Sequence, residues 1–168
     1  MFKTTDLIIR MMSDADAADV LRIFEEGMRT GMSSLETDVP GWAGWDASHL
    51  KECRLVGIID GKIAGWAALT PVSGRCVYGG VAEESVYVGE SFRGMGVGVQ
   101  LLEALIESSE NKGFWTLQAG IFAENRASIR AHEKAGFRIV GTREKLGRLN
   151  GVWKDIVLME RRSGKVGV

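Results

Sequence analysis

A glycine-rich turn beside an acidic strand is the part of this sequence best suited to chemistry. Glu83 leads into a predicted strand over residues 84–88, and residues 93–98, Arg-Gly-Met-Gly-Val-Gly, follow a short loop. The glycines open directly into an amphipathic helix predicted over residues 97–112. The first N–H groups of a helix have no internal partner, and the helix dipole adds positive charge there. The turn is therefore a candidate seat for an anion such as a diphosphate.

Two familiar nucleotide-binding classes are disfavoured by the details of this turn. It lacks the Lys-Ser/Thr ending of a P-loop, which argues against ATP. The strand before it lies in the middle of the chain, after a β-meander, whereas a dinucleotide-binding domain carries its glycines in its first unit. NAD is disfavoured for that reason.

The elements that position this turn follow from hydrophobic periodicity and turn signals. Asp60-Gly61 is a strong hairpin signal between two apolar runs, and Ser13 is suited to cap the first helix. Short connections predict antiparallel pairing, and the strand–helix–strand units after Glu83 predict a parallel pair with a right-handed crossover. Strands are predicted at residues 7–11, 55–59, 63–69, 84–88, 115–121, from 137 onward and 152–159, and helices after residue 13, at 97–112 and at 125–135.

These elements predict an α/β (α+β) fold with a mixed sheet of six to seven strands and helices on both faces. A length of 168 residues without a linker or repeat predicts one domain over residues 1–168. The segment 31–46, with Trp42 and Trp45, is expected either to pack on the core or to line a substrate pocket. The polar tail, residues 161–168, is expected to fray.

Bulk properties exclude several classes of function. A formal net charge of −1 argues against a nucleic-acid binder, and no apolar run approaches the length needed to cross a bilayer. Cys53 and Cys76 form no metal-ligand pattern, so no metal is expected, and two thiols suit a reducing compartment. No signal peptide is evident, and a cytoplasmic protein is the expectation.

The motifs also resemble a known family. Arg-x-x-Gly-x-Gly at residues 93–98, after Ser-Val-Tyr-Val at 85–88, resembles the acetyl-CoA signature of the GNAT N-acetyltransferase superfamily. Residues 125–137, from Asn125 to Phe137, resemble the next conserved block. Three further segments resemble one branch of that superfamily, the phosphinothricin and methionine sulfone (sulfoximine) acetyltransferases. They are residues 37–46, 78–88 and 151–155.

The resemblance implies acetyl-CoA as the co-substrate. Its diphosphate would lie on the turn, and its pantetheine arm would pair with the edge of the strand at 86–88, which the family splays from its parallel neighbour at 115–121. The Val88 N–H would donate to the thioester oxygen, which becomes an oxyanion. The implied cofactor contacts are Val86, Tyr87, Val88, Arg93, Gly94, Met95, Gly96, Val97, Gly98, Val99, Asn125 and Ser128.

The resemblance also implies catalytic roles, each with a structural alternative. Glu83 is the candidate base for the amine, or else a surface ion pair. His132 could protonate the leaving thiolate, or be a half-buried structural histidine. Asn125 could bind the pantetheine arm and also cap a helix. Glu84 points the other way from Glu83, and a solvated or salt-bridged side chain is expected there.

The expected function is transfer of acetyl to the α-amine of a small amino-acid-like molecule, without a metal. Arg75 is a candidate for the substrate carboxylate, or an exposed loop arginine, and Tyr78 and Glu83 complete the expected substrate contacts. A homodimer is expected from the branch, with neither nucleic acid nor membrane as partner. Two alternatives stay open, an acetyltransferase for protein N-termini or polyamines and a non-catalytic acyl-CoA sensor.

Overall fold

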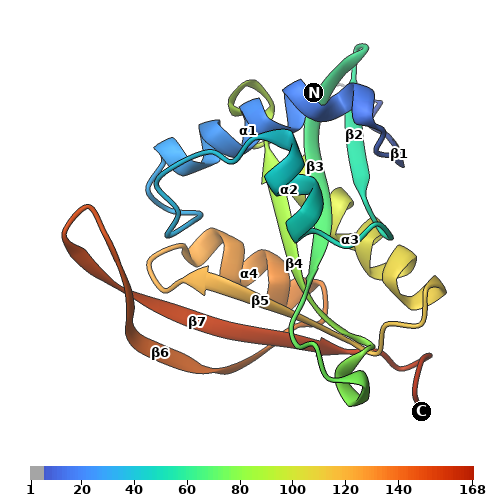
Figure 1. The fold of residues 1–168 in the computed structure, drawn as a ribbon, viewed down its shortest axis with the longest axis vertical. Coiled ribbons are helices and arrows are strands. Elements are labelled where there is room, and N and C mark those ends of the chain that lie inside the picture. Colours follow the sequence, from blue (N-terminus) through green and yellow to red (C-terminus); the bar gives the residue numbers. More distant parts are fainter. Residues whose placement is uncertain (1–5) are drawn as a thin grey trace.

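The computed structural model describes residues 6–168, which form a sheet of seven strands covered by four helices (Figure 1). The strands are β1 (Ile8–Met11), β2 (Leu55–Ile59), β3 (Lys62–Pro71), β4 (Val81–Val88), β5 (Thr116–Phe122), β6 (Arg138–Leu149) and β7 (Val152–Arg162). The helices are α1 (Ala17–Arg29), α2 (Trp42–Ser48), α3 (Val97–Asn111) and α4 (Arg126–Lys134), with short 3-10 turns η1 (Asp14–Asp16), η2 (Cys76–Tyr78) and η3 (Glu90–Phe92).

The sheet is mixed, as the connection lengths predict. Its strand order is β1-β2-β3-β4-β5-β7-β6, and β4 and β5 form its parallel pair, joined through α3. The other neighbours pair antiparallel. Asn150 and Gly151 turn β6 back into β7, which lies between β5 and β6 and makes the last hairpin a curved arm of the sheet (Figure 1).

Helices cover both faces of the sheet, and each face has its own apolar core. α1 and α2 pack on one face, where Trp45 of α2 is 1% exposed and lies edge-on to Trp66 of β3. α3 packs on the other face through Val97, Leu101 and Leu105. The sheet is thus a wall between two layers, and alternate residues of β4 face opposite layers. Among the described helices, none is long and apolar enough to cross a membrane.

The parallel pair separates after only three residues. β4 pairs with β5 from Val81 to Glu83, where Glu83 lies opposite Gln118, although β4 continues to Val88 alongside β3. Beyond Glu83 the two strands have no common ladder. The splay expected between the central parallel strands is therefore present, and it leaves one side of the second half of β4 without a partner strand.

The prediction of a frayed C-terminal tail is wrong. β7 continues to Arg162, and the Ser163 N–H donates to the Trp115 carbonyl at 2.8 Å. The Arg162 guanidinium also donates to the carbonyls of Val166 and Gly167. Because several backbone groups of the tail are paired, the segment is held beside the start of β5 although its composition is polar.

Gly65 of β3 provides a test of how closely β3 and β4 approach. A Cβ at this position would lie 2.7 Å from the Tyr87 carbonyl oxygen and 3.0 Å from Leu101 Cδ1. We expect Gly65→Ala to lower the free energy of unfolding by about 2 kcal/mol, because backbone must move to make room. Urea unfolding measures the change.

A matched control is available in α2. A Cβ on Gly44 would meet Pro40 Cβ at an ordinary 3.5 Å. Gly44→Ala should therefore raise the free energy of unfolding by up to about 1 kcal/mol, because glycine inside a helix is costly. Equal effects of the two substitutions would contradict the described β3–β4 contact.

Candidate active site

A cavity of about 340 Å³ lies between the second half of β4, the glycine-rich turn and α4. Its floor is apolar, and its rim carries the turn and the polar side chains of α4. The residues that line it are Val86, Val88, Phe92, Arg93, Gly94, Gly96, Val97, Gly98, Val99, Leu102, Ser128, Ala131 and His132.

The glycine-rich turn presents free backbone donors to this cavity. Gly94 and Gly96 have φ values of 76° and 80°, which side-chain-bearing residues adopt only with strain. The first internal hydrogen bond of α3 runs from the Gln100 N–H to the Gly96 carbonyl, at 3.2 Å, so the N–H groups of residues 97–99 have no partner inside the helix. A cluster of such donors at a helix N-terminus suits a phosphate. Met95, also in the turn, is exposed and does not line the cavity.

Arg93 is fixed beside the turn by α1. Its guanidinium donates to the Glu26 carbonyl at 3.3 Å, and the Glu26 carboxylate accepts the Glu90 N–H at 2.7 Å. Burial alone would raise the pKa of Glu26, but the Glu90 N–H and the Arg22 guanidinium outweigh it and hold the pKa below its ordinary value. Arg93 therefore brings positive charge to the cavity rim.

The splay exposes the backbone of Val86 and Val88. The Gly89 N–H donates to the Ala64 carbonyl on β3 at 2.8 Å. Because successive residues of a strand point their backbone groups to opposite sides, Tyr87 also faces β3, whereas Val86 and Val88 face β5. Their N–H and C=O groups look into the splay, where no strand pairs with them.

Tyr87, one of the expected cofactor contacts, points to the opposite face of β4 from Val86 and Val88. Its ring stacks on Trp66 at 4.8 Å between centroids, on the α1–α2 face, and its hydroxyl donates to the Ser33 carbonyl at 3.4 Å. Tyr87 therefore does not line the cavity that holds the glycine turn. Side-chain parity along the strand explains this, since residues 86 and 88 face the opposite layer.

Asn125 caps α4, as its position predicts. Its Oδ1 accepts the Ser128 N–H at 3.2 Å, and its Nδ2 donates to the Met32 carbonyl at 3.4 Å. The cap fixes the start of α4 at the mouth of the splay, where Asn125 and Ser128 line a second, smaller cavity of about 140 Å³. His132, one turn after Ser128, lines both this splay cavity and the first.

His132 is a buried member of an ion pair. Its Nε2 lies 2.5 Å from Glu84 Oε1, and its Nδ1 lies 2.7 Å from the Ser128 carbonyl oxygen. Burial alone would lower the pKa of His132, but the hydrogen bond and charge of Glu84 and the Ser128 carbonyl outweigh it and raise the pKa. Phe137 packs edge-on against the ring.

Of the two environments expected for Glu84, the structure excludes the solvated one. The residue is 7% exposed and points into the α3–α4 layer. Its second oxygen, Oε2, has no hydrogen-bond partner among the described residues. The Glu84 side chain points to the opposite face of β4 from Glu83, as predicted. The sequence does not indicate that His132 contacts this face.

Glu83 points into a third cavity, of about 360 Å³, on the α1–α2 face. Its Oε1 accepts a hydrogen bond from Gln118 Nε2 at 3.3 Å, and no ion pair of the described residues includes it. This acceptor-side cavity is lined by Phe24, Ser33, Ser34, Glu36, Pro40, Trp45, Ser48, His49, Trp66, Thr70, Glu83, Glu84, Ser85, Tyr87 and Gly120.

His49 of this cavity is absent from the sequence predictions, whereas Glu36 and Trp45 belong to the segment 31–46, for which a pocket wall is one of the two expectations. His49 stacks on Trp45 at 3.9 Å between centroids, and its Nδ1 lies 2.7 Å from the Trp45 carbonyl oxygen. Burial lowers the pKa of His49, against the raising effect of the Trp45 carbonyl, and the charge of Arg54 lowers it further. His49 belongs to no spacing motif, so only the packing of the α2 region on the sheet reveals it.

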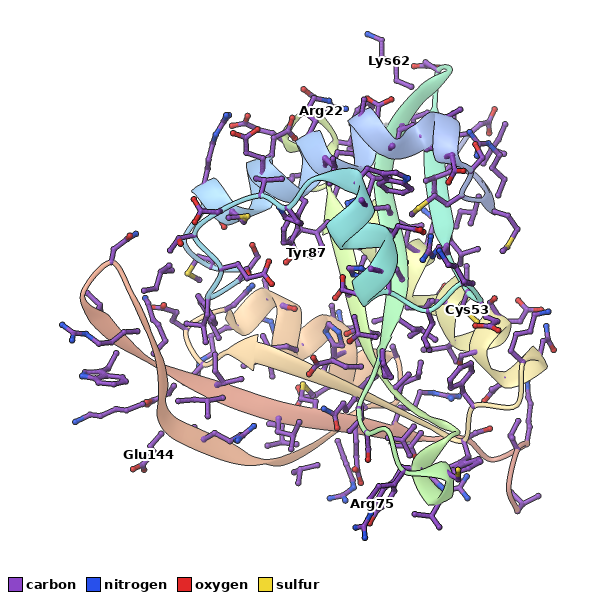
Figure 2. The ribbon with its side chains drawn as sticks, in the orientation of Figure 1. Arg22, Cys53, Lys62, Arg75, Tyr87 and Glu144 are labelled. Carbon is purple, nitrogen blue, oxygen red and sulfur yellow. The ribbon has the colours of Figure 1, made fainter. Side chains whose placement is uncertain are left out.

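The structure does not bring Arg75 or Tyr78 to the acceptor-side cavity. Arg75 is exposed on the β3–β4 loop and projects from the lower end of the molecule, away from Tyr87 (Figure 2). Tyr78 follows on η2 and lines a separate groove with Leu50 and Phe114. Glu83 is the last residue of the β4–β5 ladder, at the end away from η2. Within one chain, the structure therefore gives no support for contacts of Arg75 and Tyr78 with a substrate beside Glu83.

Metal ligation has no candidate in the described part of the chain. Within residues 6–168, no three His, Cys, Asp or Glu side chains are placed to hold an ion. Cys53 is buried and Cys76 is exposed, each without a thiol partner among the described residues.

Comparison with known proteins identifies the architecture. The sequence model of the Acetyltransferase (GNAT) family matches residues 18–137, more than half of the chain. The chain belongs to the GNAT family of acetyltransferases. The match includes the glycine-rich turn and all of α4, so both walls of the first cavity lie within the GNAT region.

Relatives of this GNAT chain include enzymes named for small acceptors. The L-methionine sulfoximine/L-methionine sulfone acetyltransferase of Pseudomonas paraeruginosa is 39% identical over 103 residues, which span 60% of this chain and 58% of that protein. That match thus spans little more than half of the relative's length. The phosphinothricin N-acetyltransferase of Streptomyces viridochromogenes is 31% identical over 157 residues, 91% of this chain and 86% of that protein.

A solved structure of the same family contains acetyl-CoA. The GNAT superfamily phosphinothricin acetyltransferase of Sinorhizobium meliloti, in complex with AcCoA, matches with a TM-score of 0.88 and 25% identity, over 96% of this chain and 90% of that one. The first cavity of the present chain fits such a ligand. It combines N–H donors and Arg93 for a diphosphate with an apolar floor and an open strand edge for an amide-bearing arm.

The two hydrogen bonds of Asn125 can be separated by substitution. Asn125→Ala should lower the free energy of unfolding by about 1 kcal/mol, because it removes the cap of α4. Asn125→Asp keeps an oxygen for the Ser128 N–H and should leave stability within about 0.5 kcal/mol of the wild type. Urea unfolding of the two variants measures both values, and equal losses would show that the contact with Met32 outweighs the cap.

Proposed function

We propose that this chain transfers acetyl from acetyl-CoA to the amine of a small molecule. The observation that carries the proposal is the splay of β4 from β5. It opens the strand edge at Val86 and Val88 between the cavity of the glycine turn and the cavity of Glu83. A thioester held on one side can meet an amine held on the other.

The acetyl donor would be bound by backbone groups. The diphosphate would accept hydrogen bonds from the turn at residues 94–99, with Arg93 adding charge. The pantetheine amides would pair with the free edge of β4, as an added strand does. The Val88 N–H would then donate to the thioester oxygen as negative charge develops on it in the tetrahedral intermediate.

Glu83 would receive the proton that the amine loses. An alkyl amine is largely protonated near pH 7, and it attacks only in its neutral form. Glu83 lines the acceptor-side cavity, and within residues 6–168 its one hydrogen-bond partner is the Gln118 amide, so its second oxygen is available to an amine or to a water molecule. His132, on the donor side of the same strand, would protonate the departing thiolate.

Two classes of acceptor have support. The relatives that act on methionine sulfone or phosphinothricin favour a small amino-acid-like molecule. The acceptor-side cavity favours a cationic amine without a carboxylate, such as a polyamine, because Glu36 and Glu83 line it and none of its described lining residues is Lys or Arg. We take the amino-acid-like acceptor as the first candidate. We also propose a homodimer, which could add a basic group to the cavity.

The role of Glu83 is tested by Glu83→Gln. We expect kcat for thiol release from acetyl-CoA in the presence of methionine sulfone to fall by about a hundredfold or more, because the amide cannot accept the proton. Acetyl-CoA affinity, measured by calorimetry, should be unchanged. Glu103→Gln, on the exposed face of α3, is the matched control and should retain full activity. Unchanged kcat in Glu83→Gln would contradict the role.

The acceptor class is tested by a thiol-release screen. Amino acids, their sulfones and sulfoximines, phosphinothricin, spermidine and an N-terminal peptide would be compared by kcat/KM. A preference for methionine sulfone or phosphinothricin of about tenfold or more over spermidine supports the first candidate. The reverse preference, reduced by Glu36→Gln, supports the cationic amine. Acetyl-CoA binding without turnover of any amine would indicate a sensor and contradict the proposed transfer.

A further inference from the structure

We infer that Glu84 is a positioning residue for the acetyl transfer, which holds His132 as an imidazolium with its Nε2–H at the boundary between the two cavities. The inference rests on the proposed function, in which His132 supplies the proton for the departing thiolate. It adds a second acidic residue of β4 with a task distinct from that of Glu83.

The contacts of the imidazole fix where its protons lie. The Ser128 carbonyl oxygen can only accept, so Nδ1, 2.7 Å away, carries a proton. Nε2 lies 2.5 Å from Glu84 Oε1, and a carboxylate can only accept as well. An ionised Glu84 therefore requires a proton on both ring nitrogens. The Glu84 side chain is 3% exposed and the His132 side chain 10% exposed, so the two charges are compensated by each other rather than by bulk water.

The pair lies where the cavity of the glycine turn meets the splay cavity. His132 lines both cavities, and Glu84 lines the splay cavity. The charged groups around the imidazole come from few elements. β4 contributes Glu84, and the glycine turn contributes Arg93, at the rim of the first cavity, which His132 also lines. The other two residues that contact the ring, Ser128 and Phe137, are uncharged.

The proton balance of the transfer then closes. An ammonium substrate first releases one proton to solvent. The neutral amine then attacks the thioester carbonyl carbon, the C–N bond forms, and the remaining extra proton on nitrogen passes to Glu83. The C–S bond breaks, its electron pair remains on sulfur, and the thiolate takes the Nε2 proton of His132. The neutral imidazole keeps its Nδ1 proton, and solvent returns one proton to Nε2 and removes one from Glu83. Glu84 exchanges no proton, but its charge favours the imidazolium between turnovers.

A nuclear magnetic resonance titration of the ligand-free protein tests the inference without requiring catalysis. In wild-type protein labelled with 15N-histidine, we expect both ring nitrogens of His132 to have protonated shifts at pH 7. The midpoint of its titration should lie above the ordinary value of about 6.5. A bare Nε2 at pH 7 would overturn the inference, and this outcome needs no variant to fold.

Variants separate charge from packing. Glu84→Gln removes the charge and should lower the midpoint of His132 by about one pH unit or more, whereas Glu84→Asp should retain much of the raised midpoint. Glu103→Gln should leave it unchanged. An equal midpoint in wild type and Glu84→Gln would overturn the inference.

Kinetics then distinguishes this inference from the proposed function. In Glu84→Gln, we expect the alkaline limb of kcat to move to lower pH, with about a tenfold loss at pH 8 and little change in KM for acetyl-CoA. Glu84→Asp should restore most of kcat. A uniform loss at every pH would indicate a structural role only. A raised midpoint in a protein that acetylates no amine would contradict the proposed function and leave the ion pair intact.

Discussion

The early end of the β4–β5 ladder is the constraint on which the rest of the structure depends. Three residue pairs hold the parallel strands together, up to Glu83 and Gln118. Val86 and Val88 remain in register with β3, but their own N–H and C=O groups face the β5 side, where they have no partner strand. Unpaired backbone groups favour any ligand that offers complementary amides. A local defect in pairing is thus what turns a structural sheet into a binding site.

β4 divides the proposed chemistry between its two faces. Side chains alternate along the strand, so the neighbouring carboxylates Glu83 and Glu84 enter different layers. Glu83 meets the amide of Gln118 and a cavity under α1 and α2, whereas Glu84 meets the imidazole of His132 under α4. The same residue type therefore has two environments, one open to an amine and one that compensates a buried positive charge.

Local features of the sequence were sufficient to predict most of the fold. Apolar periodicity, the Asp60-Gly61 turn and the glycines that flank α3 identify the elements and their order, because these signals are determined over a few residues. The environment of Glu84 could not be predicted, because it depends on how α4 packs on β4. The same holds for His49 under α2 and for the paired tail after β7. The expected contacts of Arg75 rested on spacing along the chain, and the paired part of β4 separates it from Glu83 in space.

Amide hydrogen exchange of β4 tests most directly whether the splay is the seat of acetyl-CoA. The Val86 and Val88 amides face the splay, and the Tyr87 amide between them already faces β3, which makes it an internal control. Saturating acetyl-CoA should slow exchange at Val86 and Val88 by about tenfold or more and leave Tyr87 unchanged. Binding of acetyl-CoA with no added protection at Val86 and Val88 would contradict the account.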